Sequence, residues 1–257
     1  MDVTERFTEL MARPDPEIAL DEAALLIAAH AHPHLDVDAR LAQLDRIAAR
    51  AAGFSAGELS TLLFVSEGFR GNDTDYGDPR NSFLDDVLDR HLGIPITLSV
   101  VMLEVGRRCG LQLHGVGMPG HFLVGGGPGE WFDPFHDGAR LDLAGCAELF
   151  AQQHANTRFR AQFLMPVGPR DIVQRMLGNL QHTFLQRDPK AVVWVVRLRL
   201  RVPGITLSQR GDLAGTLGRL GQFAEAAREL DVLAQLLPGE GGEQAAAAAA
   251  SLRARAN

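Results

Sequence analysis

The sequence contains only two cysteines, Cys109 and Cys146, among its 257 residues. Two cysteines are too few for the disulfide framework of a small secreted protein, which favours two free thiols in a reducing compartment. The chain also lacks any run of about 18 to 20 apolar residues, the length that a membrane-spanning helix needs. Its charged first residues, MDVTERFTEL, include no apolar stretch of the kind found in signal peptides. We therefore expect a cytoplasmic protein with no membrane partner.

Positive charge is scarce as well. The 25 lysines and arginines are outnumbered by 32 aspartates and glutamates, which gives a formal net charge of −7. General nucleic-acid binding requires a basic surface, so this balance predicts no nucleic-acid partner. Hydrophobic residues make up 46% of the chain, which is enough for a true core. The length suits one large domain or two modest domains.

Helical patterns fill the first 70 residues, and Asp36 is placed to cap the second of these helices. A turn-rich segment, GNDTDYGD, follows at residues 71–78. Helix is then predicted again over residues 79–91, immediately after this turn-rich segment.

A longer helix is predicted to begin at Pro95, because the first helical position leaves its N–H unbonded and proline has none. Gly93 separates it from the preceding helix. The helix should end near Arg108, with Gly110 directly beyond its end as a residue able to adopt the left-handed conformation.

Strand patterns follow. Residues 111–118 alternate as a strand does, residues 121–124 form a second short strand, and the sequence GGGPG at 125–129 is typical of a hairpin turn. Residues 130–133 would be the returning strand. Helix resumes over residues 142–155.

The stretch Met-Pro-Val-Gly-Pro at residues 165–169 predicts a domain boundary, with one domain at 1–165 and another at 170–257. All of the second domain has a helical pattern. It carries small residues where helices would touch, an aromatic residue after a turn and an exit at Leu237-Pro238, and so resembles tetratricopeptide repeats. The predicted fold class is α+β: a helix-rich domain with a small antiparallel sheet, followed by an all-α helical tail.

Three segments of the first domain carry a family resemblance: DPRNSFLDDVLDRHLGIPITLSVVMLEVGRRCGL at 78–111, GVGMPGHFLV at 115–124 and WFDPF at 131–135. Together they resemble the bacterial branch of the transglutaminase-like superfamily that carries a tetratricopeptide tail. The resemblance covers roughly residues 35–240. It implies a papain-like α+β fold for the first domain.

The same resemblance implies which residues to compare with a catalytic triad. In catalytic members a cysteine opens a helix, a histidine opens a strand, and an aspartate follows a tryptophan. His121 and Asp133 match the histidine and the acid, whereas Pro95 stands where the cysteine would be. A helix N-terminus stabilises a thiolate, and the histidine transfers a proton while the acid orients its ring. Proline has no nucleophilic atom, so the thiol mechanism loses its central group.

Two hydroxyls, Thr97 and Ser99, lie nearest to this position in the sequence. Ser99 is one helical turn beyond Pro95 and therefore lies on the same face, which leaves open a serine-hydrolase mechanism. The structural alternative is that His121 bonds a strand end or Asp133 and serves stability. A third interpretation is a surviving pocket that binds a ligand or peptide without cleaving it.

Neither cysteine is expected to replace the missing nucleophile. Cys109 lies at the far end of the predicted helix, about 20 Å from Pro95, and a buried core thiol is the better interpretation. Cys146 follows Gly145 near a helix start, a position that can activate a thiol, but a structural role is favoured there too.

Polar residues are dense between Asp78 and Arg90. Burying such groups unpaired costs several kcal/mol each, so we expect ion pairs around the mouth of a pocket, with Asn81, Asp85 and Arg90 partly buried. A solvated helix face with one or two salt bridges is the alternative. The expected pocket residues are Asn81, Asp85, Arg90, Pro95, Gly120 and Trp131.

Three histidines, His30, His32 and His34, alternate around Pro33. Their spacing matches no common metal-ligand set and no cysteine accompanies them, so we expect a solvated helix end and no metal. No segment of the sequence predicts a cofactor.

The resulting hypothesis is a non-catalytic transglutaminase-like protein, a pseudoenzyme, that serves as a binding or scaffold module. Its helical tail would present a groove to a protein or peptide partner. The alternative is a hydrolase or acyl transferase that uses His121 and Asp133 with a hydroxyl or water as nucleophile. A purely structural role within a complex is the remaining possibility.

Overall fold

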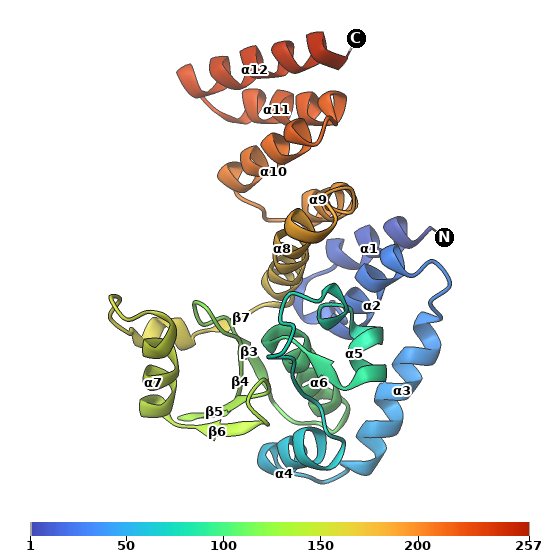
Figure 1. Cartoon of the computed structure of the whole chain (residues 1–257), viewed down its shortest axis with the longest axis vertical. Coiled ribbons are helices and arrows are strands. Elements are labelled where there is room, and N and C mark those ends of the chain that lie inside the picture. The colour runs from blue at the N-terminus through green and yellow to red at the C-terminus, as the bar shows by residue number, and fades with distance from the viewer. Residues whose placement is uncertain (1, 257) are drawn as a thin grey trace. The chain divides into compact units, whose positions relative to one another are not determined.

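The structure is a computed structural model that describes residues 2–256 (Figure 1). Its internal contacts divide the chain into two compact units, Met1–Met176 and Leu177–Asn257. The first unit combines helices with a small antiparallel sheet, and the second is entirely helical in its described part. This confirms the predicted α+β class with a helical tail. No described helix has the length and apolar character needed to cross a membrane.

Four helices begin the first unit: α1 (Val3–Ala12), α2 (Leu20–Ala31), α3 (Val37–Arg50) and α4 (Ala56–Thr61). Asp36 caps α3 as predicted, since its carboxylate accepts the N–H of Ala39 at 3.0 Å. Residues 23–29 of α2 are all buried, and four of them are alanine, which lets neighbouring helices approach closely. Short helical turns occur at Asp15–Glu17, Leu62–Ser66, Pro79–Asn81 and Ala161–Leu164.

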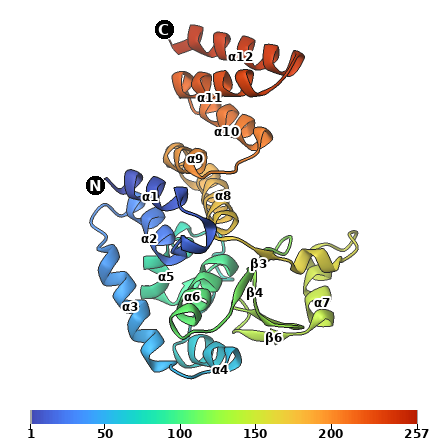
Figure 2. The ribbon, with the colours of Figure 1, turned by 180° about the vertical axis from the view of Figure 1, so that it is seen from behind.

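The central helix of the unit is α6 (Pro95–Arg108), which begins and ends where the sequence predicts. Gly110 follows it with a positive φ of 76°, the conformation expected beyond a helix end. Every residue from Pro95 to Gly106 is buried. Figures 1 and 2 both show why: helices α3 and α5 (Leu84–Arg90) lie on one side of α6, and the sheet lies on the other.

The sheet has the strand order β6-β5-β4-β3-β7, and every neighbouring pair is antiparallel. Its strands are β3 (His114–Val116), β4 (Leu123–Gly127), β5 (Glu130–Asp133), β6 (Ala139–Leu141) and β7 (Pro166–Val167). Helix α7 (Leu143–Gln153) contributes Cys146, Leu149 and Phe150 to a buried cluster that also contains Val116 and Leu123 of the sheet. The sheet is therefore packed on both faces.

Several details differ from the sequence predictions, among them the unpredicted strands β6 and β7. The helix expected over residues 79–91 is interrupted, because Ser82 and Phe83 separate the turn at Pro79–Asn81 from α5. His121 lies in the loop before β4 instead of opening the strand, and its N–H donates to the carbonyl of Met118 at 3.0 Å. A parallel pair of two-residue strands, β1 (Arg70–Gly71) and β2 (Leu92–Gly93), was not predicted, because such short strands leave no periodic pattern.

Helix α8 (Pro169–Arg187) contains the boundary between the two units. The second unit continues with the helices α9 (Val192–Arg201), α10 (Leu207–Arg219), α11 (Phe223–Leu236) and α12 (Glu240–Ala256). Thr206 begins α10 with a capping box that it forms with Gln209. Gly221, with φ of 79°, turns the chain from α10 into α11. Helices α9 to α12 pack on one another in chain order. The tetratricopeptide kinship of the tail stays a prediction.

Candidate functional site

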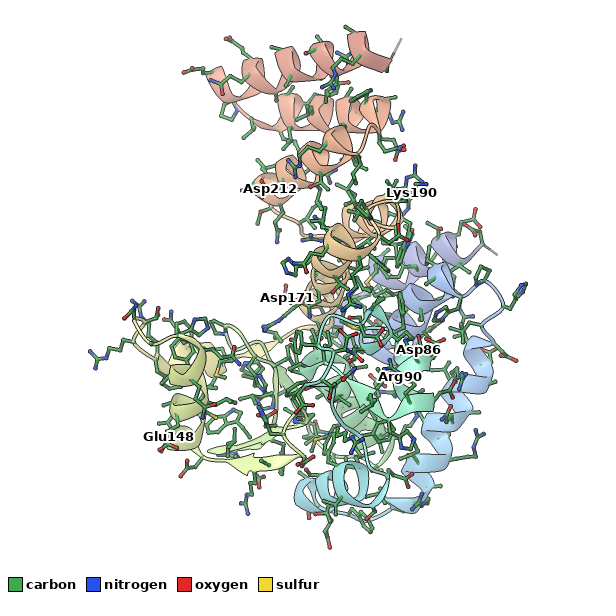
Figure 3. The ribbon with its side chains drawn as sticks, viewed as in Figure 1. Asp86, Arg90, Glu148, Asp171, Lys190 and Asp212 are labelled. Atoms are coloured by element: carbon green, nitrogen blue, oxygen red, sulfur yellow. The ribbon has the colours of Figure 1, made fainter. Side chains whose placement is uncertain are left out.

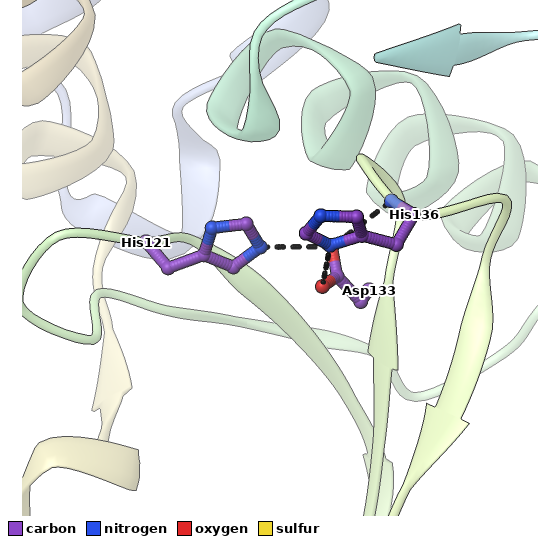
Figure 4. Close-up of side chains that lie close together, drawn as sticks. All are labelled: His121, Asp133 and His136. Atoms are coloured by element: carbon purple, nitrogen blue, oxygen red, sulfur yellow. Dashed lines mark hydrogen bonds and ion pairs between the residues drawn. The ribbon is translucent and has the colours of Figure 1, made fainter. Parts of the chain in front are cut away.

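The hairpin of β4 and β5 brings His121 and Asp133 together. The two strands are antiparallel with Val124 opposite Phe132, so the residues before β4 lie beside the end of β5. His121 precedes β4 by two residues, and Asp133 is the last residue of β5. Their side chains meet with His121 Nε2 2.8 Å from Asp133 Oδ1 (Figure 4). The pairing that the family resemblance implies is present in the structure.

Asp133 bridges two histidines. Its Oδ1 also accepts the backbone N–H of Phe135 at 3.0 Å, and its Oδ2 lies 2.7 Å from Nδ1 of His136. The side chain is only 3% exposed. Burial by itself would raise the pKa of Asp133, but the hydrogen bonds and charges of His121 and His136 outweigh it and hold the pKa below its ordinary value. The carboxylate is thus the fixed charge around which both imidazoles are arranged.

Sequence reasoning missed His136. Its ring stacks on that of His121, with centroids 5.6 Å apart and an angle of 18° between the planes. Its side chain is 54% exposed, whereas that of His121 is 3% exposed. The available signal was the sequence Asp-Pro-Phe-His, in which a turn after Asp133 returns the third residue to the aspartate. His136 is the member of the group that faces solvent.

The His121 ring is held from several directions. Arg175 donates to the carbonyl oxygen of His121 at 2.6 Å and to that of Met118 at 3.0 Å, which fixes the loop that carries the ring. The Phe135 ring meets the imidazole edge to face at 6.2 Å. Since Nε2 faces Asp133, Nδ1 is the ring nitrogen left to exchange a proton. It makes no hydrogen bond with any residue in the described chain.

The residues at the start of α6 are all buried and engaged. Pro95 occupies the first helical position. Thr97 is completely buried and donates its hydroxyl to the carbonyl of Asn81 at 2.6 Å, while Ser99 is completely buried and donates to the carbonyl of Pro95 at 2.8 Å. Ser99 therefore back-bonds within its own helix, as serines in helix interiors often do. Neither hydroxyl is presented to His121 as a free nucleophile.

The two thiols are not activated. Cys146 is fully buried, and this burial, with the charges of Asp142 and Asp133, raises its pKa to about 11. Burial also raises the pKa of Cys109, which is only partly buried and so is not the core thiol that the sequence predicts. A thiol with a raised pKa carries little thiolate at neutral pH, so it is a poor nucleophile.

Asn81 and Arg90 belong to one polar network, beside Thr97. Asn81 is completely buried: its amide donates to the carbonyl of Asp75 at 2.8 Å, and its Oδ1 accepts from Asn72 at 3.0 Å. Arg90 donates to Asn81 at 3.4 Å and to Asp78 at 3.2 Å. This network fixes the loop before α5 against the start of α6.

The other expected pocket residues lie elsewhere. Asp85 is buried, but its partner is His32 at 2.6 Å. Gly120 has a positive φ of 78° and lies under the end of α7, where a Cβ would meet Gln153 and His154. Trp131 packs against the buried cluster beneath α7. The six expected pocket residues thus lie in different parts of the first unit, and among them only Asn81 and Arg90 are hydrogen-bonded to each other.

His121, Asp133 and His136 together form the Asp133 group. A cavity of about 540 Å³ adjoins this group on the side of His136. Its wall comes from the loop after β1 and the turn after β5, and the lining residues include Arg70, Asn72, Asp73, His136 and Asp137. Arg70 forms no ion pair with any residue that the structure describes. The cavity therefore offers an unpaired cation, two acids and an imidazole to a ligand.

A family model described as the transglutaminase-like superfamily matches residues 19–178, which include all of α6, His121 and Asp133. The chain belongs to the transglutaminase-like superfamily. This agrees with the resemblance carried by the three sequence segments. Membership is shown by the family match and by the relatives described next.

Relatives of two kinds share this transglutaminase-like sequence. A UPF0162 protein of Xylella fastidiosa is 32% identical over 241 residues, which are 82% of this chain and 85% of the relative. A UPF0162 protein of Pseudomonas aeruginosa is 32% identical over 191 residues, 70% of each chain. F-box only protein 21 of Homo sapiens is 31% identical over 133 residues, 48% of this chain and 20% of the relative. No solved structure matches the chain.

Gly71 controls the shape of the cavity in this transglutaminase-like unit. A Cβ added there would lie 2.6 Å from both the ring and the carbonyl oxygen of Phe135, closer than real contacts allow. We expect Gly71→Ala to displace Phe135 and to lower the free energy of unfolding by about 1–3 kcal/mol. Gly57→Ala in α4 is the control, because a Cβ there meets nothing within 4 Å. Urea unfolding that gave the two variants equal stability would contradict this packing.

Proposed function

We propose that this transglutaminase-like protein is a non-catalytic binding or scaffold module. The observation that carries the proposal is the start of α6, where Pro95 stands at the position that the resemblance assigns to the nucleophile. The two nearest hydroxyls, on Thr97 and Ser99, are fully buried and hydrogen-bonded to backbone carbonyls. A covalent acyl transfer needs an accessible nucleophilic atom beside the base, and this site supplies none from its side chains.

The Asp133 group then has a structural task that its geometry supports. Asp133 links the loop before β4, through His121, to the turn after β5, through His136 and the N–H of Phe135. That turn forms one wall of the 540 Å³ cavity. A buried charged network of this kind holds a binding surface in one conformation. The residues that would perform catalysis in an active relative would here position the cavity.

The chemistry of the cavity favours a polar ligand with charges of both signs, such as a peptide segment. Arg70 and His136 can bind a carboxylate, and Asp73 and Asp137 can bind an ammonium group. The exposed side chains of His136 and Asp137 permit such contacts without rearranging the core. A mainly apolar ligand would leave these groups without partners.

The helical tail supports a protein-binding role. Helices α9 to α12 stack in chain order, and arrays of helical pairs commonly present grooves to peptides. Leu236 on α11 is 57% exposed, and Val232 lies one turn earlier on the same helix with 36% exposure. We expect this apolar stripe to contact a partner, as in a tetratricopeptide repeat.

The relatives also support a modular role. The region shared with F-box only protein 21 makes up a fifth of that longer protein, so the transglutaminase-like segment occurs there joined to other sequence. A domain whose sequence recurs in such different chains is suited to placing binding surfaces next to other domains.

Kinetics with matched variants test the absence of catalysis. Wild-type protein should show no turnover above the blank with ester, amide or glutamine-donor substrates. Ser99→Ala should leave this unchanged and lower the free energy of unfolding by about 1 kcal/mol, because it removes one neutral hydrogen bond. Turnover that His121→Gln abolishes, in a variant with an unchanged circular dichroism spectrum, would contradict the proposal.

Binding is tested separately by NMR titration with short peptides that carry a free carboxylate and a free amine. We expect chemical shifts to change for residues that line the cavity and to stay constant in Arg70→Ala. An absence of shifts at the cavity with every peptide would contradict the ligand class and leave the helical tail as the binding surface.

One observation favours the second candidate, a hydrolase that activates water. Asp133 holds Nε2 of His121, and Nδ1 has no hydrogen-bond partner in the described chain, so the ring could act as a general base. This mechanism needs no side-chain nucleophile. The His121→Gln comparison distinguishes it from the binding role, because only the hydrolase loses turnover.

A further inference from the structure

A second cluster of histidine and carboxylates lies where the end of α2 meets the start of α5. His32 directly follows α2, and Asp85 and Asp86 stand in the first turn of α5. Nδ1 of His32 lies 2.6 Å from Oδ2 of Asp85, and Nε2 lies 3.7 Å from Oδ2 of Asp86. Ligand atoms from the three residues all lie within 4.8 Å of one another. This spacing is compatible with three ligands around one ion.

Two carboxylate oxygens of the cluster are buried without any hydrogen-bond partner, Oδ1 of Asp85 and Oδ2 of Asp86. The Asp85 side chain is only 9% exposed. Buried polar atoms are nearly always bonded, and an ionised oxygen without a partner is especially unfavourable. The two orphaned oxygens therefore indicate a missing positively charged partner.

Neighbouring arginines do not fill this need. Arg40 is bound to Asp89 through hydrogen bonds of 2.5 and 2.7 Å. Arg90, labelled with Asp86 in Figure 3, bonds Asp78 at 3.2 Å. Within the described chain, no lysine or arginine donates a hydrogen bond to Asp85 or Asp86. Arg40 acts on both carboxylates through its charge alone, and Arg80 and Arg90 act on Asp86 in the same way. The ring of His32 is the one basic group of the described chain within 4.0 Å of them.

The Asp133 group differs from the His32 cluster in how its carboxylate oxygens are bonded. It also places two histidines and an aspartate within 4.8 Å. Both oxygens of Asp133, however, already accept hydrogen bonds, from His121 on one side and His136 on the other. A metal there would have to break those bonds. At His32 an ion would instead satisfy two atoms that have no partner.

A cavity adjoins two of the three residues, His32 and Asp85. This cavity of about 450 Å³ is lined by His32, Asp85, His34, Asp36 and Arg40, among others. It is large enough for hydrated ions to enter and for water to complete a coordination shell. His34 is exposed on the same cavity wall, two residues from His32.

We propose that His32, Asp85 and Asp86 bind a divalent transition-metal ion. One imidazole and two carboxylates suit zinc, manganese or cobalt, and three protein ligands with water in the remaining position form an open site. The ion would join the end of α2 to the start of α5, two elements separated by more than 50 residues in the chain. This site is independent of the proposed binding function, and its ligands lie outside the Asp133 group.

Equilibrium dialysis of the full chain against zinc, after treatment with a chelator, tests the proposal. We expect one equivalent of zinc to bind and the melting temperature to rise, with cobalt giving a visible absorption band from the same site. Asp86→Asn should weaken zinc binding about tenfold or more, and His32→Gln should abolish the cobalt band. Without metal, Asp86→Asn should melt no lower than wild type, because it removes an unpartnered buried charge.

Two matched variants assign the ion to this cluster. Asp89→Asn changes an exposed carboxylate on the same helix, and His136→Gln removes one histidine of the Asp133 group. Both should bind zinc as wild type does. The proposal is overturned if no zinc binds, if Asp86→Asn and His32→Gln both bind zinc normally, or if the zinc is lost in His136→Gln.

Discussion

Replacing Asp133 by alanine is expected to lower the free energy of unfolding by about 3–5 kcal/mol, because each buried hydrogen-bond donor that loses its acceptor costs about 1–3 kcal/mol. The substitution leaves the buried Nε2 of His121 and the N–H of Phe135 without acceptors. It also frees the turn that carries His136. The loss should be measured by urea unfolding at neutral pH, with circular dichroism and tryptophan fluorescence compared to confirm a single transition.

The pH dependence of this effect has a definite sign. The pKa of Asp133 in the folded protein is below its ordinary value of 3.8. A carboxylate with a lowered pKa stabilises the fold fully above the ordinary value and loses that contribution as pH falls through the folded value. The stability difference between wild type and Asp133→Ala should therefore be present above about pH 5 and shrink below about pH 4.

Glu148→Ala is the control for this series. Glu148 is exposed on α7 (Figure 3), so its removal should change the unfolding free energy by less than about 0.5 kcal/mol. Equal losses for Asp133→Ala and Glu148→Ala at pH 7 would show that the Asp133 network contributes little. If the stability difference between wild type and Asp133→Ala did not decrease below about pH 4, the charge of Asp133 would not be the cause of that difference.

The elements that the sequence predicted well are those with strong local signals. Pro95 and Gly110 bound α6 because proline and glycine act through their own backbone preferences. Asp36 likewise caps α3 through atoms three residues away. Such features depend on few residues and need no knowledge of the tertiary structure.

The missed features depend on contacts between distant segments. His32 and Asp85 are 53 residues apart, so nothing in the local sequence shows that they meet at 2.6 Å. The strands β6 and β7 have three and two residues, too few for a period to be visible. His136 was overlooked because its role arises from the turn geometry after Asp133 and not from a motif.

The pairing of His121 with Asp133 is an intermediate case. Their spacing of 12 residues across a hairpin made contact plausible, and the family resemblance assigned the roles. The resemblance could not show that Ser99 bonds the carbonyl of Pro95. Because of that contact the Ser99 hydroxyl is not free, and this follows only from the packing of the side chain in the folded helix.

A second large effect is expected at the end of α6, where Arg108 neutralises two buried acids. It donates to Asp21 at 2.5 Å and to Glu104 at 3.2 Å, whose side chains are 2% and 5% exposed. Arg108→Leu should lower the free energy of unfolding by about 3–5 kcal/mol, because it leaves these carboxylates poorly compensated. Arg107→Leu is the matched control, since Arg107 is 58% exposed and bonds the same acids from the solvent side. Its loss should be about 1 kcal/mol or less.

The stability gap of the Arg108 variant should also grow with pH, although the pKa shift behind it has the opposite direction to that of Asp133. Burial, and next the charge of Asp21, already raise the pKa of Glu104 above its ordinary value of 4.5. Removing Arg108 should raise that pKa further. A group with a raised pKa favours the fold below its unfolded pKa, and that contribution is lost as pH rises through the folded value. The stability gap between wild type and Arg108→Leu should thus widen from about pH 4 to pH 7. A stability gap that narrowed over this range would mean that Asp21 and Glu104 are neutralised by groups other than Arg108. An equal loss of unfolding free energy in Arg107→Leu would mean that Arg107 neutralises them to the same extent.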